Sequence, residues 1–452
     1  MKDLLIDLHL EKYNCDFIDL RIENTILTKI RITNGELGEG ITTPKKGGFI
    51  RVRNRGKWYY SSTTKLDDLE TTIKDLVKSS GAETLFKDTP PANINFKERS
   101  TVSEDSIVFE SVERKKDLLE KSKGVLESEE KVSFYNLAYR EEYDTKYYIS
   151  SKGKAHKFTV ARSGIVAFYI LKDGDDSFAT SFEQFGLKYD EFKDFDQKVK
   201  SDLEEAKKFL YAPTVEAGKY PVILSEKTAG VFAHESFGHK SEADFMIGDE
   251  NMKKEWEIGK KVGSSILSIV DEGDIEGTSG FVPFDDEGNV KKKVYLIKNG
   301  TLTGRLHSEE TAEIIGEENT GNARAVNFYF EPIVRMTNTY IEAGDQTFEE
   351  LLSTIDDGFY IKEPSHGMGM STFTIAVNRA YRIKKGKLGE PVKINVISGT
   401  VFETLEKISG LSNEIKIISN VFGGCGKMEQ SIFTLPVGMG GPKVKVDEMM
   451  VS

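Results

Sequence analysis

The sequence predicts an α+β protein in two parts: an N-terminal mixed α/β domain with antiparallel strands over residues 1–212, and a C-terminal, mainly antiparallel β domain over 213–452 that carries a metal-binding helix. Three observations lead to this prediction. The length of 452 residues fits two or three domains of roughly 100–200 residues each. Apolar and polar residues alternate in short runs in both halves. The stretch YAPTVEAGK, residues 211–219, has the mixed composition of a linker.

The N-terminal part begins with a predicted helix and a β-meander. Leucines at helical spacing predict a helix over residues 3–13. Apolar and charged residues then alternate in three runs, at 18–22, 30–32 and 50–52. The turn signals around these runs are Asn34-Gly35, Lys46-Gly47-Gly48 and Arg55-Gly56. Such alternation is typical of antiparallel strands with one buried face, so we expect a meander of half-buried strands.

Helices and two longer strands complete the N-terminal part. Apolar residues in steps of three and four predict an amphipathic helix over 65–79. A charged stretch over 104–128 is also expected to be helical. Strand-like segments at 132–149 and 157–171 follow, and a helix over 190–210 closes this part of the chain.

The C-terminal part opens with a strand and a capped helix. Residues 220–224 are predicted to form the strand, and Ser225 is predicted to cap a helix that runs to about residue 240. Asn299-Gly300 is the dipeptide of a tight β-hairpin. The remaining predicted elements are strands near 328–341, 372–384 and 391–398, helices near 346–357 and 400–408, and an irregular glycine-rich stretch over 420–444.

Composition and charge exclude several classes of protein. The net charge is −12, from 62 basic and 74 acidic residues, which argues against direct contact with nucleic acid. No apolar run approaches the ~20 residues that a membrane helix needs, and the N-terminus lacks the pattern of a signal peptide. We therefore expect a soluble, cytoplasmic protein without membrane contact. The two cysteines, Cys15 and Cys425, exclude a disulfide framework, although one disulfide between them is formally possible.

The chemistry is concentrated in the segment AHESFGH, where His234 and Glu235 are followed by His239. Two histidines can hold a metal while an adjacent carboxylate takes a proton from water. At an i, i+5 spacing the histidines would lie about 140° apart on an ideal helix, so convergence needs a π-bulge or a helix end before His239. We predict an irregular turn at Gly238. The spacing alone equally fits two surface histidines beside a salt-bridging glutamate.

A zinc site needs a third ligand, for which the sequence offers Cys425, His307 and His366. Cys425 is the clearest candidate, because it lies between glycines in GGCGK and a thiolate favours zinc or iron over magnesium. Cys15, by contrast, is interpreted as a small buried hydrophobic residue. The phosphate-loop pattern GxxxxGK[ST] does not fit GGCGK, because Val421 and Met428 occupy two of its defining positions. No residue can be assigned to substrate binding.

Several segments together resemble one known family. HESFGHKSEADF, RMTNTYIEAG and the closing CGKMEQSIFTLPVGMGGPKVKVDEM look like the TldD/PmbA family of metalloproteases, and the early FIDLRIE and GGFIRVRNRGKWYYSST look like its N-terminal domain. The resemblance spans essentially the whole chain and favours the metal interpretation of the i, i+5 spacing. It implies a TldD-type subunit in which His234, His239 and Cys425 bind zinc, or iron in its place, and Glu235 acts as the general base.

The resemblance also implies substrates and partners. Such enzymes degrade unfolded or small peptides and pair with a related, metal-free subunit of the PmbA/TldE type, or assemble with themselves. The alternative from another class is a regulatory or binding subunit, related to gyrase or to antitoxins, in which zinc is structural and Glu235 is incidental. A different zinc hydrolase, such as a deaminase, is disfavoured because the H-x-E…P-C-x-x-C signature is absent.

Overall fold

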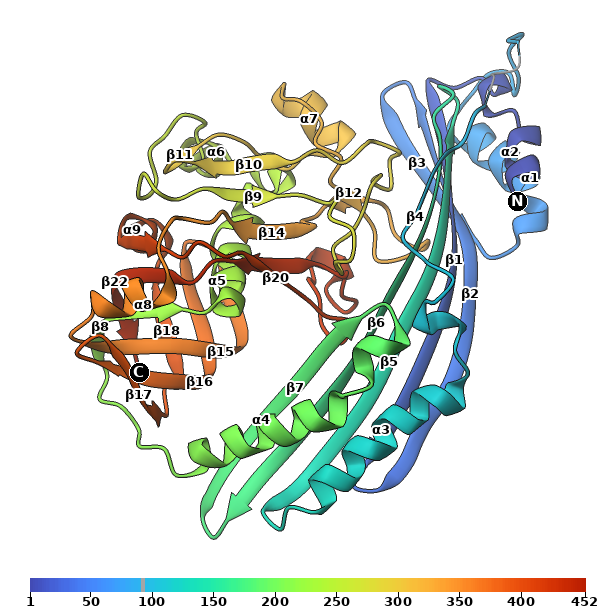
Figure 1. Cartoon of the computed structure of the whole chain (residues 1–452). Coiled ribbons are helices and arrows are strands. Elements are labelled where there is room, and N and C mark those ends of the chain that lie inside the picture. The colour runs from blue at the N-terminus through green and yellow to red at the C-terminus, as the bar shows by residue number, and fades with distance from the viewer. Residues whose placement is uncertain (91–93) are drawn as a thin grey trace.

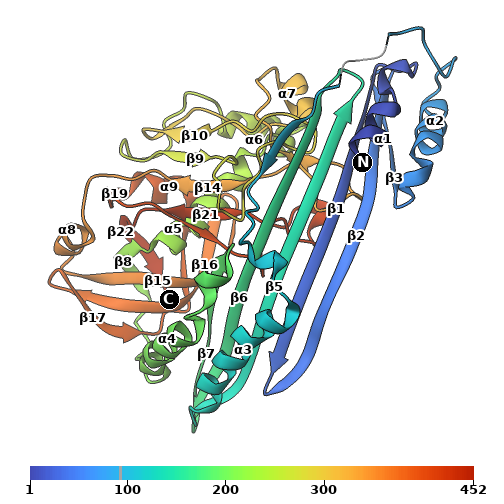
Figure 2. The same ribbon diagram turned by 45° about the vertical axis from the view of Figure 1, so that its right-hand side comes forward.

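The computed structural model describes residues 1–90 and 94–452. Its N-terminal half is built on one long, curved sheet, in the order β3-β2-β1-β5-β6-β4 with β7 also paired to β6 (Figure 1). The strands of this sheet are β1 (Phe17–Thr33), β2 (Glu36–Asn54), β3 (Lys57–Thr63), β4 (Lys97–Ser100), β5 (Val132–Ser150), β6 (Ala155–Asp173) and β7 (Asp176–Gly186). Figure 2 shows the sheet as a tall wall beside the C-terminal half.

The predicted meander of short strands is instead one long hairpin. β1 pairs with β2 along its whole length, and the turn between them is Asn34-Gly35, as predicted. The predicted turn at Lys46-Gly47-Gly48 is wrong, because these residues lie inside β2 opposite Asn24, Glu23 and Ile22. A side chain on Gly47 would overlap the ring of Phe328. This glycine therefore marks a close approach between the two halves rather than a turn.

The apolar face of the long sheet is covered by helices. Ile18, Leu20 and Ile22 belong to the core beneath α1 (Lys2–Asp7) and α2 (Leu69–Ser79). Further along the same strand, Ile30 and Ile32 share a core with α3 (Val112–Glu127) and α4 (Phe195–Leu210). The helices predicted over 65–79, 104–128 and 190–210 are thus present, but they start at Leu69, Val112 and Phe195, four, eight and five residues later than expected. The helix predicted over 3–13 ends at Asp7, and His9 then takes a positive φ of 47°.

The opposite face of the sheet carries charges that are buried. Asp19, Arg21 and Glu23 are all less than 5% exposed, so the expectation of half-buried strands is wrong for the first part of β1. Further along, Ile30 and Ile32 are buried and Arg31 is exposed, as expected. Arg21 pairs directly with Asp286 of the C-terminal half. Asp19 pairs with Arg51 of β2, which also pairs with Glu287 of the C-terminal half. Alternation of apolar and charged residues indicates two chemically different faces, and over residues 17–23 both faces are covered, one by helices and one by the rest of the protein.

The C-terminal half contains two main sheets with a helix between them. One sheet has the order β11-β10-β9-β14-β21-β20, and the other has the order β15-β8-β22-β18-β16-β17 with β19 at its side. The additional pairing of β15 with β16 closes five of these strands into a ring. The strands are β8 (Gly218–Leu224), β9 (Ile269–Asp271), β10 (Val294–Lys298), β11 (Thr301–Leu302), β14 (Asn338–Ile341), β15 (Asp357–Gly369), β16 (Thr372–Lys384), β17 (Lys387–Val392), β18 (Val396–Thr400), β19 (Ile408–Leu411), β20 (Lys416–Ser419), β21 (Gly438–Gly441) and β22 (Val444–Val451).

Helix α5 (Glu226–Ala233) runs between these two sheets (Figure 1) and contributes to the largest apolar core. The smaller elements around them are α6 (Glu250–Glu255), α7 (Glu309–Ile315), α8 (Phe348–Ser353), α9 (Val401–Glu406), β12 (Ala323–Arg324) and β13 (Ile333–Val334). The hairpin predicted at Asn299-Gly300 joins β10 to β11. The predicted α+β class is confirmed. The domain boundary between residues 212 and 213 stays a prediction. Within the described residues, no helix combines the length and apolar character needed to cross a membrane.

Candidate metal centre

The segment with the two histidines begins as an ordinary helix and then changes its winding. Ser225 follows β8 and caps α5, as predicted, by accepting a hydrogen bond from the backbone N–H of Thr228. The chain then forms a π-helical turn over His234–Gly238 and a 3-10 turn over His239–Ser241. The wider π turn brings the rings of His234 and His239 to a centroid separation of 5.0 Å. The predicted irregular turn is therefore confirmed.

The reason for glycine at position 238 differs from the one predicted. Gly238 has ordinary helical dihedral angles, φ −57° and ψ −52°, so it does not supply an unusual backbone conformation. A side chain at this position would instead overlap the sulfur of Met336, which is fully buried beside it. The glycine thus allows the π turn to lie directly on the segment that contains Met336.

Cys425 reaches the histidines from a loop that folds back on itself. Its backbone N–H and carbonyl both pair with Leu435, at 2.9 and 3.0 Å. The glycines on either side allow this fold, because a side chain on Gly424 would overlap the carbonyl of Leu435 and one on Gly426 would crowd Ser431. The glycines therefore close the loop rather than only giving the thiolate access to an ion.

The three side chains form one compact donor group. Atoms of His234, His239 and Cys425 all lie within 4.8 Å of one another, and the sulfur of Cys425 is 3.4 Å from Nε2 of His239. Burial alone would raise the pKa of Cys425, but the charge and hydrogen bonds of both histidines lower it well below its usual value. Two imidazoles and a thiolate at these separations fit zinc, which binds nitrogen and sulfur ligands.

Charged residues surround His239 on the side away from Cys425. Nδ1 of His239 is 3.0 Å from Oε2 of Glu242, and the same carboxylate lies 3.1 Å from Nζ of Lys427. Burial works against ionisation of Glu242, but Lys427 and His239 lower its pKa to about 2. Burial likewise lowers the pKa of His239, yet Glu242 and Cys425 together raise it to about 11. His239 is therefore held between two negative groups.

Glu235 lies beside the donor group but does not belong to it. Glycines of β15 press against it: a side chain on Gly367 would crowd Cγ of Glu235, and one on Gly369 would crowd its backbone carbonyl. Burial raises the pKa of Glu235, an effect that the neighbouring histidines partly offset. A carboxylate with a raised pKa next to such a donor group is suited to accept a proton.

A cavity of about 530 Å³ opens at Glu235. Residues from the long sheet, from α5, from β15 and from the glycine-rich loop line it, so both halves of the chain contribute. Its polar lining consists of Thr180, Ser181, Glu183, Lys227, Glu235, Glu363, Ser365, His366, Asn378 and Asn420. The volume falls in the range of small-molecule and cofactor sites, roughly 300–1,000 Å³.

The two competing histidines lie elsewhere. His307 is buried and bonded through Nε2 to Glu317 at 2.9 Å and through Nδ1 to Thr311 at 3.1 Å. His366 lines the cavity at the end of β15 but is not part of the donor group. Cys15 packs partly buried against the N-terminal core and is not bonded to Cys425.

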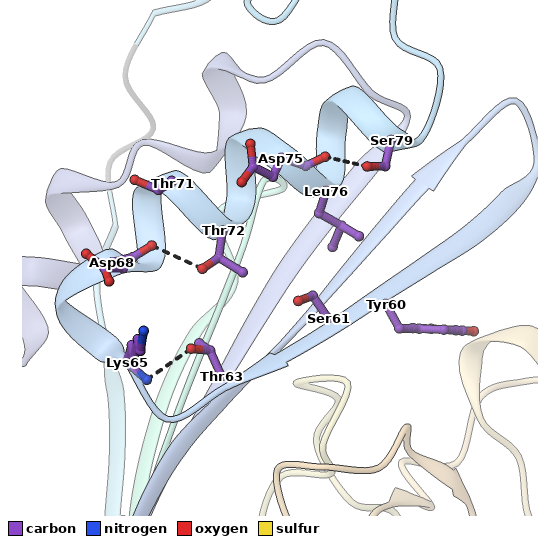
Figure 3. A pocket seen from close by; sticks show the side chains of 10 residues that line it. All are labelled: Tyr60, Ser61, Thr63, Lys65, Asp68, Thr71, Thr72, Asp75, Leu76 and Ser79. Carbon is purple, nitrogen blue, oxygen red and sulfur yellow. Dashed lines mark hydrogen bonds between the residues drawn. The ribbon is translucent and has the colours of Figure 1, made fainter.

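A second hollow, of about 510 Å³, lies between β3 and α2 (Figure 3). Its lining is polar, but the hydroxyl groups are used locally: Thr72 donates to the carbonyl of Asp68, and Ser79 donates to that of Asp75. None of the residues that line it is a histidine or a cysteine. It lacks the donors found around Glu235, so we place no catalytic chemistry there.

Sequence reasoning missed Glu242, Lys427 and Arg335. All three are less than 5% exposed, and the guanidinium of Arg335 donates to the carbonyl of Cys425. Glu242 stands three residues after His239, a spacing that places it near the histidine and that the sequence contains. The contacts of Lys427 and Arg335 join distant segments, and no local pattern indicates them.

Comparison with known proteins finds metallopeptidase domains similar to both halves of this chain. A family model described as "PmbA/TldA metallopeptidase C-terminal domain" matches residues 217–452, and one described as "PmbA/TldA metallopeptidase domain 1" matches residues 18–81. A protein of Synechocystis named as a metalloprotease is 32% identical over 96% of this chain and 94% of its own. A "Zinc metalloprotease TldD homolog" of Saccharolobus solfataricus is 28% identical over 98% of this chain and 97% of its own.

A solved structure has the same fold. The crystal structure of TldE from Thermococcus kodakarensis matches with a TM-score of 0.76, covering 100% of this chain and 99% of that one. The sequence identity is 16%, so this similarity concerns the fold alone.

Proposed function

Because this chain belongs to the TldD/PmbA family of metalloproteases, we propose that it is a zinc-dependent peptidase that hydrolyses peptide bonds of unfolded or small peptides. The observation that carries this proposal is the position of Glu235. This carboxylate lies directly beside the group formed by His234, His239 and Cys425 and at the same time lines the cavity. Glu235 follows His234 in sequence, and Gly424, which also lines the cavity, precedes Cys425. A peptide in the cavity would therefore lie against the proton acceptor and next to the two segments that carry the proposed metal ligands.

In this proposal His234, His239 and Cys425 hold zinc, and Glu235 moves the proton. Zinc, when bound, activates water and polarises a peptide carbonyl. Glu235 accepts a proton from the attacking water and returns it to the amine nitrogen that leaves. Burial supports the first of these steps, because it raises the pKa of Glu235 and so strengthens it as a base. Iron in place of zinc would use the same three ligands.

A structural zinc site is the alternative. Such a site is usually closed by four protein ligands, whereas a catalytic site has three and one open position. Among the described residues, the clustered donors are only His234, His239 and Cys425. This count favours the catalytic proposal over a regulatory subunit with structural zinc.

We propose that substrates bind as an added strand along β15. This strand pairs with β8 only from Phe359 to Ile361, while its pairing with β16 continues to Gly369. After Ile361, the edge of β15 is no longer paired with β8. This part of β15 continues into the cavity, which His366 and Gly367 line. Backbone hydrogen bonds to such an edge do not depend on side chains, which suits a peptidase of broad specificity.

We also propose that the active form is an oligomer, with a metal-free paralogue or with copies of this chain. The support is the common fold of this chain and a protein named TldE. Light scattering of the purified chain, alone and with a paralogue of this kind, tests it: a mass above 50.7 kDa is expected in at least one case.

The proposed activity is tested with an unstructured peptide of mixed sequence and a tightly folded protein of similar composition. Mass spectrometry should find new termini in the peptide only. A chelator should stop the cleavage, and added zinc should restore it. Cleavage that continues in the chelator would contradict the proposal.

A further inference from the structure

Glu242 connects the two segments that carry the proposed metal ligands. Its side chain is completely buried, and its Oε2 atom lies 3.0 Å from Nδ1 of His239 and 3.1 Å from Nζ of Lys427. His239 belongs to the segment that follows α5. Lys427 belongs to the glycine-rich loop, two residues after Cys425. One carboxylate therefore contacts a ligand of the first segment and fastens the loop that supplies the third ligand.

Lys427 is held on several sides. Its Nζ donates to Asp244 at 2.7 Å and to the carbonyl of Val334 at 2.8 Å, and it lies 4.3 Å from the ring of Phe245. Asp244 and Phe245 follow Glu242 closely in sequence. The lysine thus anchors the loop both to the segment of His239 and to a third segment that begins at Val334.

Three consecutive residues of that third segment touch the centre. The carbonyl of Val334 accepts from Lys427, the guanidinium of Arg335 donates to the carbonyl of Cys425, and Met336 packs against Gly238. The third segment therefore fastens the ligand loop at two points: at the carbonyl of Cys425 and at the side chain of Lys427, two residues later.

The contact with Glu242 also orients the imidazole. A carboxylate accepts hydrogen bonds, so Nδ1 of His239 carries the proton and Nε2 is the nitrogen directed at Cys425, 3.4 Å away. A carboxylate behind a ligating histidine fixes its tautomer and its ring orientation, and losing such a partner typically weakens metal binding 10–100-fold.

We propose that Glu242 and Lys427 are positioning residues that hold His239 and the Cys425 loop in the geometry for the metal. This inference rests on the proposed metal site. It concerns the affinity and geometry of that site rather than the reaction itself.

The test measures zinc affinity of the full chain by competition with a chromogenic chelator, and the absorption spectrum of the cobalt-substituted protein. Glu242→Gln removes the charge but keeps the shape, and Lys427→Met removes the cation. Each should weaken zinc binding about 10–100-fold and alter the cobalt spectrum. The zinc affinity of the double variant should be little lower than that of whichever single variant binds zinc more weakly, because both residues act through one connected group.

Lys240→Met is the matched control. Lys240 is also buried, also paired with a carboxylate, Glu255 at 2.6 Å, and adjacent to His239 in sequence, but it contacts none of the three ligands. This variant should keep the zinc affinity and cobalt spectrum of the parent, even where it melts at a lower temperature. If Glu242→Gln does not fold, Glu242→Asp, which keeps the charge but shortens its reach, is measured in the same way and should bind more weakly than the parent.

Zinc affinities and cobalt spectra equal to those of the parent in both Glu242→Gln and Lys427→Met would overturn the inference. A parent chain that binds no zinc would instead overturn the proposed function. The two failures are therefore distinguishable in one series of titrations.

Discussion

The rings of His234 and His239 meet edge to face at a centroid separation of 5.0 Å, although four residues lie between them in sequence. On a regular helix this spacing would direct them about 140° apart. The π-helical turn between them removes that divergence. Such turns are rare and occur often at functional sites, since they cost regular hydrogen bonding and persist where something requires them.

Gly238→Ala should disturb this turn. The added methyl group overlaps the sulfur of Met336, which is fully buried, so we expect a loss of about 1–3 kcal/mol in the free energy of unfolding and weaker zinc binding. Thermal melting and zinc titration measure both effects. Gly124→Ala is the control: this glycine lies inside α3 with no atom near the new methyl group, so the substitution should be neutral or stabilising.

The cause of that loss can be separated from general damage by a double-mutant cycle. Met336→Ala leaves a cavity and destabilises the protein by itself. In Gly238→Ala with Met336→Ala, however, the total loss should be smaller than the sum of the single losses. Strict additivity would contradict the contact described between these residues.

Cys425→Ser should remove most of the zinc from the chain, because a hydroxyl group is a poor substitute for a thiolate ligand. Cys15→Ser should leave the zinc content unchanged, since Cys15 is outside the donor group and is the only other cysteine. Elemental analysis after dialysis measures both. Equal zinc in the two variants would contradict the role proposed for Cys425.

Local signals in the sequence predicted local structure well. The Ser225 cap, the Asn299-Gly300 hairpin and the distortion near Gly238 each depend on a few neighbouring residues, and all are present. Contacts between distant segments were not predictable in this way. Gly47 resembles a turn residue, but it lies inside a strand. Its lack of a side chain leaves room for the ring of Phe328 in the other half.

The same limit applied to the candidate site. The spacing of His234, Glu235 and His239 and the glycines around Cys425 drew attention to these residues, and the resemblance to a known family favoured the metal interpretation over two surface histidines. Glu242 and Lys427 are two charged residues among many, and only the fold places them around His239. Their burial, rather than their identity, distinguishes them.

Stability should fall in mild acid partly because of His156. This side chain of β6 stacks on Phe284 at 4.1 Å, and burial lowers its pKa to about 4. The unfolded chain, with a histidine pKa near 6.5, then binds the proton more readily than the folded chain. The contribution of His156 to stability is therefore complete above about pH 6.5 and is lost as the pH falls towards about 4.

His156→Phe keeps an aromatic ring against Phe284 but cannot take up a proton. The melting temperature of this variant should depend less on pH between about 6.5 and 4 than that of the parent. Parallel curves for the two proteins would show that His156 is not responsible.

Proline substitution along a cleaved peptide should test the proposed strand addition at β15. Alternate residues of an added strand give their N–H groups to the partner strand, and proline has none to give. Cleavage should therefore fall in an alternating pattern as proline moves along the peptide. An equal response at every position would contradict strand addition.

The most direct test of the central claim combines metal content with cleavage of an unstructured peptide, for the parent and for Glu235→Ala. The claim predicts about one zinc per chain in both proteins and cleavage by the parent only, since Glu235 moves the proton without holding the metal. Zinc in both proteins with cleavage in neither would call for the same assay with a paralogous subunit added. Cleavage by Glu235→Ala at the rate of the parent would contradict the claim.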